Sequence, residues 1–300
     1  MLKYLFVLLL SVSFVSAAWV FVNDDGTFSS YGNEENSYVI PHQEIEEKNV
    51  FKVPEKKKKI SKKIVLPVDY EKHDKTIYLT FDDGPLAGSK NIIETLVEEG
   101  VPATMFMVGK HIEGSASRRR IYQWALDEPL ILVANHTYTH ANGRYRHFYS
   151  SEKRVLKDLK KMDVMLSRDD SAYGIRYTRL AGRNVFRLPE MHYDDLAIKS
   201  KYNESGKYDA LYAEGFYIYG WDYQWSYNPR GGRVNKTAKT IAKNIESIYK
   251  RGRTKRANKL ILLMHDFSFQ DRHQGKKNLG KLITILRKNG WKFETLETYL

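Results

Sequence analysis

The strongest constraint on the fold of this chain is the alternation of strand-like and helix-like segments between Lys75 and Leu300. Segments rich in β-branched and aromatic residues predict buried strands, whereas apolar residues spaced three or four apart predict helices. Alternation of this kind is typical of a parallel sheet that is covered by helices. We therefore expect an α/β domain over residues 75–300.

Predicted strands and helices follow one another along this domain. Strands are expected at 76–81, 103–108, 130–134, 176–180, 217–221, 259–264 and 291–293. Helices are expected at 89–100, 121–126, 151–166, 236–249 and 276–289, with Ser89 and Ser151 as N-cap residues. Functional sites in such sheets lie at the carboxyl ends of the strands, so polar residues at those ends are the first candidates for function.

Several predicted strands are followed directly by polar residues or glycine. These residues are Asp82, Asp83, His136, Gly182, Asp222 and His265. His136 and His140 are four residues apart, so a helical turn, or a loop of similar pitch, can aim both imidazoles at one ion. With Asp83 as the third ligand, the set leaves a position open for water, as a catalytic zinc site requires. Zinc is the expected metal, and cobalt or nickel fit the same ligands.

Composition narrows the alternatives. The chain has no cysteine, which excludes disulfides and thiolate ligands, so a metal must be held by His, Asp or Glu. Hydrophobic residues make up 42% of the chain, which is enough for a core and excludes global disorder. The net charge of +13 favours an anionic partner, with solubility alone as the alternative.

The N-terminus predicts export. Lys3 precedes a mainly apolar run at 4–15, and Ala17 supplies a small residue where a signal peptidase would cleave. We therefore expect a signal peptide at 1–17 and a periplasmic or extracellular location. An uncleaved membrane anchor is the alternative, although the run is short for a transmembrane span. Export disfavours nucleic acid as a partner and favours electrostatic association with an anionic cell envelope.

Residues 18–74 are expected to form a charged linker or extension, acidic in its first half and basic in its second. The short run at 64–66 (IVL) is a candidate strand that could pack on the domain.

Five segments of the domain resemble the motifs of a known family. They are TFDDGP at 80–85, HTYTH at 136–140, RLAGRNVFR at 179–187, WDYQW at 221–225 and LMH at 263–265. In this order they resemble the polysaccharide deacetylases, carbohydrate esterase family 4, and in particular the chitin-oligosaccharide deacetylases. The resemblance implies a distorted (β/α) barrel with seven parallel strands. It also implies an enzyme that removes N-acetyl groups from an oligo- or polysaccharide containing N-acetylglucosamine.

The resemblance assigns roles by matched position. Asp82 would be the general base and Arg179 would orient it and pair with its charge. The metal ligands would be Asp83, His136 and His140. These roles agree with amide hydrolysis, because a bound metal lowers the pKa of water and polarises the carbonyl while a base takes the water proton.

Other positions complete the implied site. His265 would be the general acid that protonates the leaving amine, and the backbone N–H of Gly182 would be an oxyanion donor. Aromatic side chains suit sugar-binding surfaces, and we expect Trp225 and Tyr138 to contact substrate.

Two positions depart from the family pattern. Ala181 stands where the third motif usually carries proline, and Gln224 stands where the fourth motif has an acid before its tryptophan. Because that acid normally helps to hold the arginine, we expect Asp222 to contact Arg179 in its place and to support catalysis. Residues two apart on a strand share a face, so the exchange needs only a small shift. The alternative is that Asp222 caps a strand end.

Two other functions fit the same motifs. One is an O-acetyl esterase that acts on acetylated polysaccharide, and the other is a non-catalytic carbohydrate-binding barrel that keeps the metal site. The complete set of ligands, base and acid argues against the second. We expect a monomer whose substrate is chitin oligosaccharide, peptidoglycan or an exopolysaccharide.

Overall fold

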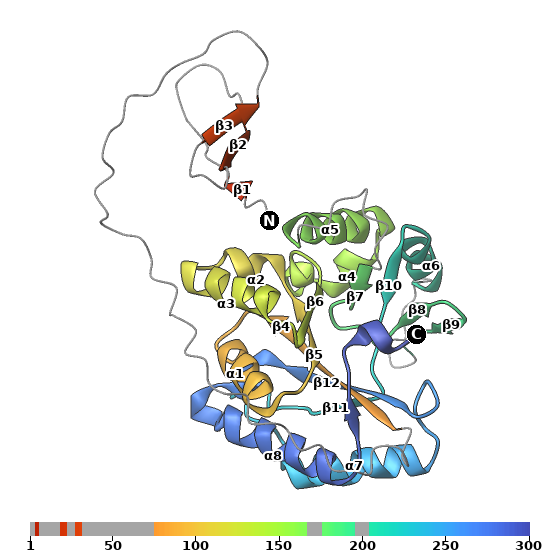
Figure 1. The fold of residues 1–300 in the computed structure, drawn as a ribbon. Helices are drawn as coiled ribbons and strands as arrows, with labels where there is room; N and C mark the ends of the chain where they lie inside the picture. The colour runs from red at the N-terminus through yellow and green to blue at the C-terminus, as the bar shows by residue number, and fades with distance from the viewer. Residues whose placement is uncertain (1–3, 6–18, 23–27, 32–74, 167–175, 196–203) are drawn as a thin grey trace. The chain divides into compact units, whose positions relative to one another are not determined.

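The computed structural model describes residues 4–5, 19–22, 28–31, 75–166, 176–195 and 204–300 (Figure 1). The chain divides into two units, residues 1–60 and 61–300, each described by itself. In the first unit, an antiparallel sheet has the order β1-β2-β3. Its strands are β1 (Tyr4–Leu5), β2 (Trp19–Val22) and β3 (Phe28–Tyr31). Neither β2 nor β3 was predicted. Most of the expected signal peptide and the candidate strand at 64–66 lie outside the described residues.

The second unit is built on one mixed sheet. Its strands are β4 (Thr76–Gly84), β5 (Ala103–Met107), β6 (Ile131–Asn135), β7 (Arg176–Thr178), β8 (Phe186–Leu188), β9 (Met191–Tyr193), β10 (Phe216–Ile218), β11 (Tyr223–Gln224), β12 (Lys259–His265) and β13 (Lys292–Phe293). They are ordered β11-β12-β4-β5-β6-β7-β10-β8-β9, and β13 pairs with β4.

The seven strands from β11 to β10 along this order run parallel, and β8 and β9 continue the sheet antiparallel. In the described part of the chain, the end strands β11 and β9 do not pair with each other. The sheet is therefore an open half-barrel with mostly parallel strands, which confirms the expected α/β class and distorted barrel.

Helices pack around the sheet. They are α1 (Ser89–Glu99), α2 (Gly109–Glu113), α3 (Ala116–Asp127), α4 (Tyr145–Tyr149), α5 (Glu152–Met165), α6 (Ser205–Ala213), α7 (Ala238–Lys250) and α8 (Gly275–Lys288). Short 3-10 helices are η2 (His140–Gly143), η3 (Asp266–Phe269), η4 (Asp271–His273) and η5 (Leu296–Thr298). In Figure 1, α8 lies between α1 and α7 along one side of the sheet.

Each predicted strand and helix is present, with its ends moved by a few residues. The sequence pattern missed α2, α4, α6, β8, β9 and β11, which are short or carry little apolar periodicity. The expected N-cap at Ser89 is wrong, because Gly88 occupies that position. The hydroxyl of Ser89 instead accepts the N–H of Leu86 at 2.7 Å and donates to Asp266. Ser151 is at the N-cap of α5 but makes no side-chain capping bond.

Successive side chains along β4 and β12 point to opposite faces of the sheet, so those that pack against the helices lie on one face and those of the site on the other. On β4, Ile77 and Leu79 join the apolar cluster that includes helix residues, whereas Tyr78 joins a second cluster on the inner face. Residues two apart share a face, so Asp82 emerges on the same inner face as Tyr78. His265 on β12 is the register partner of Asp82, and its side chain emerges beside that carboxylate.

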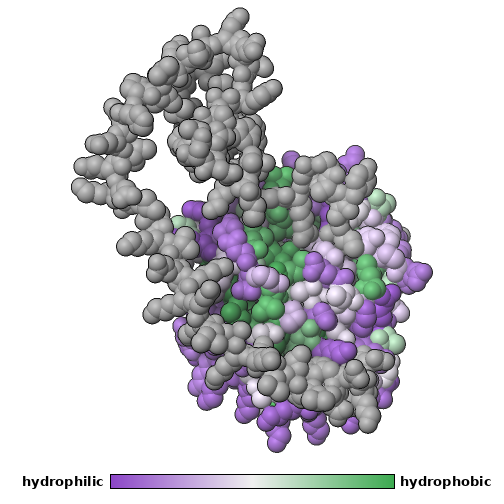
Figure 2. All heavy atoms as spheres, viewed as in Figure 1, coloured by the Kyte–Doolittle hydropathy of each residue, from purple (hydrophilic) through white to green (hydrophobic). Residues whose placement is uncertain are grey.

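The surface of the second unit is mixed in polarity. The viewed face in Figure 2 shows an apolar area bordered by hydrophilic residues. Among the described residues, the large exposed apolar side chains lie on separate segments of the chain: Val97, Leu126, Val164, Tyr193 and Leu300. No helix in the described ranges has the length and apolar character needed to cross a bilayer.

Candidate active site

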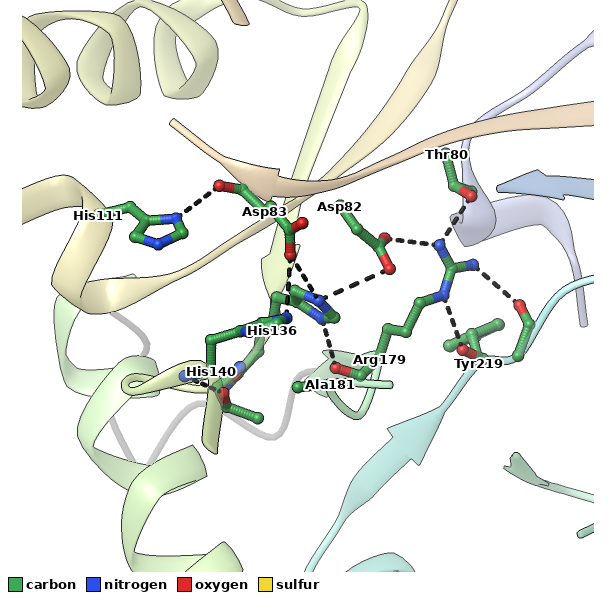
Figure 3. A network of polar contacts seen from close by, with 12 residues as sticks. Thr80, Asp82, Asp83, His111, His136, His140, Arg179, Ala181 and Tyr219 are labelled. Carbon is green, nitrogen blue, oxygen red and sulfur yellow. Dashed lines mark hydrogen bonds and ion pairs between the residues drawn. The ribbon is translucent and has the colours of Figure 1, made fainter. Parts of the chain in front are cut away.

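Asp83, His136 and His140 converge just beyond the carboxyl ends of β4 and β6 (Figure 3). Asp83 Oδ1 lies 3.0 Å from His140 Nε2 and 3.4 Å from His136 Nε2. One possible ligand atom of each residue lies within 4.8 Å of the others. The structure thus brings together the three side chains that the sequence predicts as metal ligands.

Asp82 and Asp83 reach the site together because the strand is irregular at this point. Adjacent side chains on a regular strand point to opposite faces. Asp83 has a φ of 73°, and the register between β4 and β5 shifts between Phe81 and Gly84. This break turns the Asp83 carboxylate toward the histidines while Asp82 stays on the inner face. Aspartate tolerates left-handed backbone better than most residues do.

The segment at 136–140 is a loop rather than a helical turn. Thr137 has a φ of 67° and His140 a φ of 49°. The carboxylate of Asp158 accepts the N–H of Tyr138 at 2.8 Å, and Thr137 Oγ1 accepts the N–H of His140 at 3.0 Å. The loop is thus held by side chains that replace the missing helical hydrogen bonds.

The buried atoms of this cluster fit a divalent cation. His136 Nδ1 lies 2.8 Å from the carbonyl oxygen of Arg179 and donates to it, which leaves the Nε2 lone pair on the side of Asp83. Asp83 Oδ1 is buried and receives no well-aligned hydrogen bond from the described residues. Burial acts to raise the pKa of Asp83, but the polar contacts and charges of His136 and His140 hold it well below its ordinary value. Two imidazoles and one carboxylate match a catalytic zinc site, and the same donors suit cobalt or nickel.

Arg179 anchors the carboxylate of Asp82. Its Nη1 donates to Asp82 Oδ1 and to Thr80 Oγ1, both at 2.8 Å. Its Nε and Nη2 donate to the carbonyls of Tyr219 at 3.0 Å and Gly220 at 2.9 Å. Arg179 is 0% and Asp82 3% exposed, so this ion pair is shielded from water. The predicted contact between Arg179 and Asp82 is therefore present, and it fixes the direction of the Asp82 carboxylate (Figure 3).

The predicted contact between Asp222 and Arg179 is wrong. Asp222 Oδ1 accepts the N–H of Lys255 at 2.6 Å, and Oδ2 accepts the N–H of Ile261 at 2.7 Å. Backbone carbonyls take the positions around the guanidinium that a second acid would need. Burial raises the pKa of Asp222 to about 6, while the two amide donors act in the opposite direction. Asp222 is therefore a cap, because its carboxylate bonds both to the loop before β12, at Lys255, and to β12 itself, at Ile261.

His265 stands next to Asp82 on the neighbouring strand β12, as its register partner. Its ring meets the edge of Tyr227 with centroids 5.1 Å apart. Its Nδ1 is buried and has no hydrogen-bond partner among the residues that the structure describes. Burial lowers the pKa of His265, although the carboxylates of Asp82 and Asp83 act to raise it.

The neighbour of His265 is a buried acid. Burial raises the pKa of Asp266 to about 8, even though the Ser89 hydroxyl donates to its carboxyl group.

Gly182 is exposed and has a φ of 63°, a conformation that glycine adopts freely. A Cβ at this position would lie 3.1 Å from the ring of Tyr145, so Tyr145 occupies the space beside Gly182. The hydroxyl of Tyr145 lies 3.5 Å from His140 Nδ1. Ala181 is buried and its carbonyl accepts the hydroxyl of Tyr149 at 2.7 Å, so the loop is held without the proline of the family pattern.

The predicted substrate contacts at Trp225 and Tyr138 are contradicted by burial. Trp225 is 1% exposed, donates its indole N–H to the carbonyl of Lys236 and packs against Phe269. Tyr138 is 7% exposed and donates its hydroxyl to Glu113. Both rings belong to the core cluster, so neither presents a face to a sugar.

Three aromatic or imidazole side chains of the site were not predicted: His111, Tyr145 and Tyr227. None of them lies in a recognised motif. The abundance of tyrosine, 21 residues in the chain, was the only signal in the sequence for the two phenols. His111 gave no signal, because its contact is with a main-chain carbonyl.

Comparisons with known proteins agree with this geometry. Residues 69–203 match the polysaccharide deacetylase family. A chitin disaccharide deacetylase from Vibrio alginolyticus is 24% identical over 304 residues, which cover 75% of this chain and 71% of that protein. A chitooligosaccharide deacetylase from Rhizobium leguminosarum bv. trifolii is 44% identical over 69 residues, but the match spans only 30% of that protein.

The fold is shared with a solved structure. The catalytic domain of a peptidoglycan N-acetylglucosamine deacetylase from Eubacterium rectale superposes with a TM-score of 0.53 at 20% identity. The match covers 75% of this chain and 90% of that domain. The family match, together with the motifs, shows that residues 69–203 are a polysaccharide deacetylase domain, of a family of amide hydrolases that act on N-acetyl groups.

Proposed function

We propose that this protein removes N-acetyl groups from an oligo- or polysaccharide containing N-acetylglucosamine, in a metal-dependent reaction that releases acetate. The observation that carries the proposal is the position of Asp82. It lies beside the Asp83–His136–His140 cluster, is fixed by buried Arg179 and is the register partner of His265. A base and an acid therefore flank one candidate metal site, as amide hydrolysis needs.

The residues divide the chemistry between them. A bound divalent ion supplies a more acidic water and polarises the acetyl carbonyl. Arg179 occupies Asp82 Oδ1, which leaves Oδ2 to accept the proton of the attacking water. The C–N bond breaks only if the amine nitrogen is protonated, and His265 would deliver that proton from the other side. The N–H of Gly182 would stabilise the oxygen that becomes negative.

Acetate release across a defined substrate panel tests the function. The panel contains N-acetylated chitin oligosaccharides, peptidoglycan, an N-acetylated exopolysaccharide and O-acetylated xylan, each assayed with added zinc. Because the relatives from Vibrio and Rhizobium are named for chitin-derived substrates, we expect the highest rate on chitin oligosaccharides. Release from xylan alone would instead establish an O-acetyl esterase. Binding without acetate release from any substrate would establish a non-catalytic barrel.

The control for this assay is a matched pair of histidine variants. His140→Ala removes a candidate ligand, whereas His192→Ala removes an exposed imidazole on β9. Acetate release that depends on the first histidine and not on the second is the result we expect. Cobalt and nickel added in place of zinc show which metal gives the highest rate.

We also propose that residues 1–17 are a signal peptide, that 18–74 form a charged extension and that 75–300 form the catalytic domain. The apolar run at 4–15 and the net charge of +13 support export and association with an anionic envelope. Mass spectrometry of the mature N-terminus tests the cleavage site. An N-terminus that retains residues 1–17 would instead support a membrane anchor. Elution of the purified protein on size exclusion tests the expected monomer.

A further inference from the structure

His111 is a histidine beside the site that lies outside every motif. It lies on α2, and its Nδ1 is 2.7 Å from the main-chain oxygen of Asp83 (Figure 3). A carbonyl oxygen can only accept, so Nδ1 carries the proton and donates it. The bond therefore fixes the tautomer of His111 and satisfies the Asp83 carbonyl with a side chain.

This carbonyl needs such a partner because the strand is irregular around Asp83. The φ of Asp83 is 73°, and the register with β5 shifts between Phe81 and Gly84. Peptide groups that leave a regular ladder must be satisfied elsewhere when they are shielded from water. Without the donor on His111, the peptide could return to an extended conformation. The carboxylate of Asp83 would then turn away from the two histidines, since adjacent strand residues face opposite sides.

The same short helix also bonds to the loop that carries the other two ligands. The N–H of Lys110 donates to the carbonyl of Tyr138 at 2.8 Å, and the N–H of Gly109 donates to that of Thr137 at 3.3 Å. A Cβ at Gly109 would lie 2.2 Å from the ring of Tyr138, so the close approach requires glycine. Helix α2 is thus bonded both to the end of β4 and to the loop at 136–140.

We propose that His111 is a positioning residue for the metal centre, and that its hydrogen bond to the Asp83 carbonyl holds the Asp83 carboxylate toward His136 and His140. The inference rests on the proposed metal-dependent function. His111 is not one of the ligands, because the side chains of the described residues that converge as a possible metal site are Asp83, His136 and His140; its role is to set the direction of a ligand.

The test is zinc affinity, measured by isothermal titration of the metal-stripped full chain. His111→Leu removes the donor, and His111→Asn keeps an N–H at a similar distance from the backbone. We expect His111→Leu to weaken zinc binding roughly ten- to hundredfold, as is common when a group that orients a ligand is lost. His111→Asn should stay within a few-fold of the wild type, and His192→Leu, on exposed β9, should not change it.

A second measurement separates positioning from stability. The melting temperature of each metal-free variant reports the fold, and a purely structural role would lower it without changing zinc affinity. Equal zinc affinity of the wild type and His111→Leu would overturn the inference, as would equal losses in the leucine and asparagine variants.

If His111→Leu does not fold, His111→Gln places the amide one bond further out and is expected to weaken binding more than His111→Asn. Because no substrate is present, a wild-type protein that binds zinc but releases no acetate contradicts only the proposed function.

Discussion

The two sides of the candidate site differ in how firmly their side chains are held. On the ligand side, at the ends of β4 and β6, Asp82 is bonded to buried Arg179 and His136 donates to a backbone carbonyl. On the acid side, at the ends of β11 and β12, His265 has a buried Nδ1 with no partner in the described residues. The acid of the neighbouring motif, Asp222, is bonded to backbone amides instead.

This difference indicates where the geometry is set by the fold and where it depends on substrate. A metal ligand must be aimed before the metal binds, so its supporting hydrogen bonds must exist in the free protein. A general acid acts only when the leaving nitrogen is present, and catalytic hydrogen bonds often tighten only in that complex. We therefore expect changes on the ligand side to have larger effects than changes on the acid side.

The largest effect is expected from removing a ligand. His140→Ala leaves only Asp83 and His136 for the metal, and both retained zinc and acetate release should fall below detection. Metal content by atomic absorption and acetate release are measured on the same preparation. A variant with no bound metal and full activity would contradict a metal-dependent reaction, and with it the larger effect expected for changes on the ligand side.

The next largest effect is expected at the base. Asp82→Asn keeps an acceptor for Arg179 but removes the carboxylate that takes the water proton. Turnover should fall roughly a hundredfold or more, the usual scale for losing a general base, with zinc affinity unchanged. Turnover and zinc titration are compared with the wild type at neutral pH. Near wild-type turnover would exclude Asp82 as the base.

A smaller effect, on stability rather than chemistry, is expected at Asp222. Asp222→Ala leaves the amides of Lys255 and Ile261 without their acceptor, which should cost about 1–3 kcal/mol of unfolding free energy. Turnover per folded molecule should stay within a few-fold of the wild type, because the carboxylate does not contact Arg179. Urea unfolding and kcat measure the two quantities. A large loss of kcat at unchanged stability would return Asp222 to the catalytic set.

The sequence predicted which polar side chains come together better than it predicted which aromatic and capping side chains are buried. Spacing and strand ends pointed to Asp83, His136 and His140, and the structure brings these three together because a strand and the loop after it impose their proximity. The burial of Trp225 and the capping role of Asp222 depend on which face of β11 meets the core, and a strand of two residues carries too little alternation to show this.

The same limit applies to the fold as a whole. Long apolar strands such as β4 and β12 were predicted within a few residues of their ends. The antiparallel strands β8 and β9 were missed, because three residues each cannot show a period. His111 could not have been found, since no side-chain pattern records a bond to a carbonyl that only an irregular strand exposes.

The smallest predicted effect concerns Gln224, which stands where the family pattern has an acid. Gln224 is the register partner of Leu263, so its side chain shares the face of Leu263 and of His265 two residues further on. A carboxylate at position 224 could therefore reach the imidazole of His265, whose Nδ1 has no hydrogen-bond partner among the described residues. Burial lowers the pKa of His265, so its protonated form is lost at a lower pH than for an ordinary histidine.

A nearby negative charge opposes that loss, because it favours the protonated imidazole. Gln224→Glu should raise kcat/KM a few-fold on the alkaline side of the pH profile and leave the acidic side unchanged. Gln224→Leu, which adds no charge, is the matched control and should not move the alkaline limb. If the glutamate and leucine variants have the same profile, the missing acid does not limit proton delivery. The looser hold on His265 would then be a property of the fold without consequence for the rate.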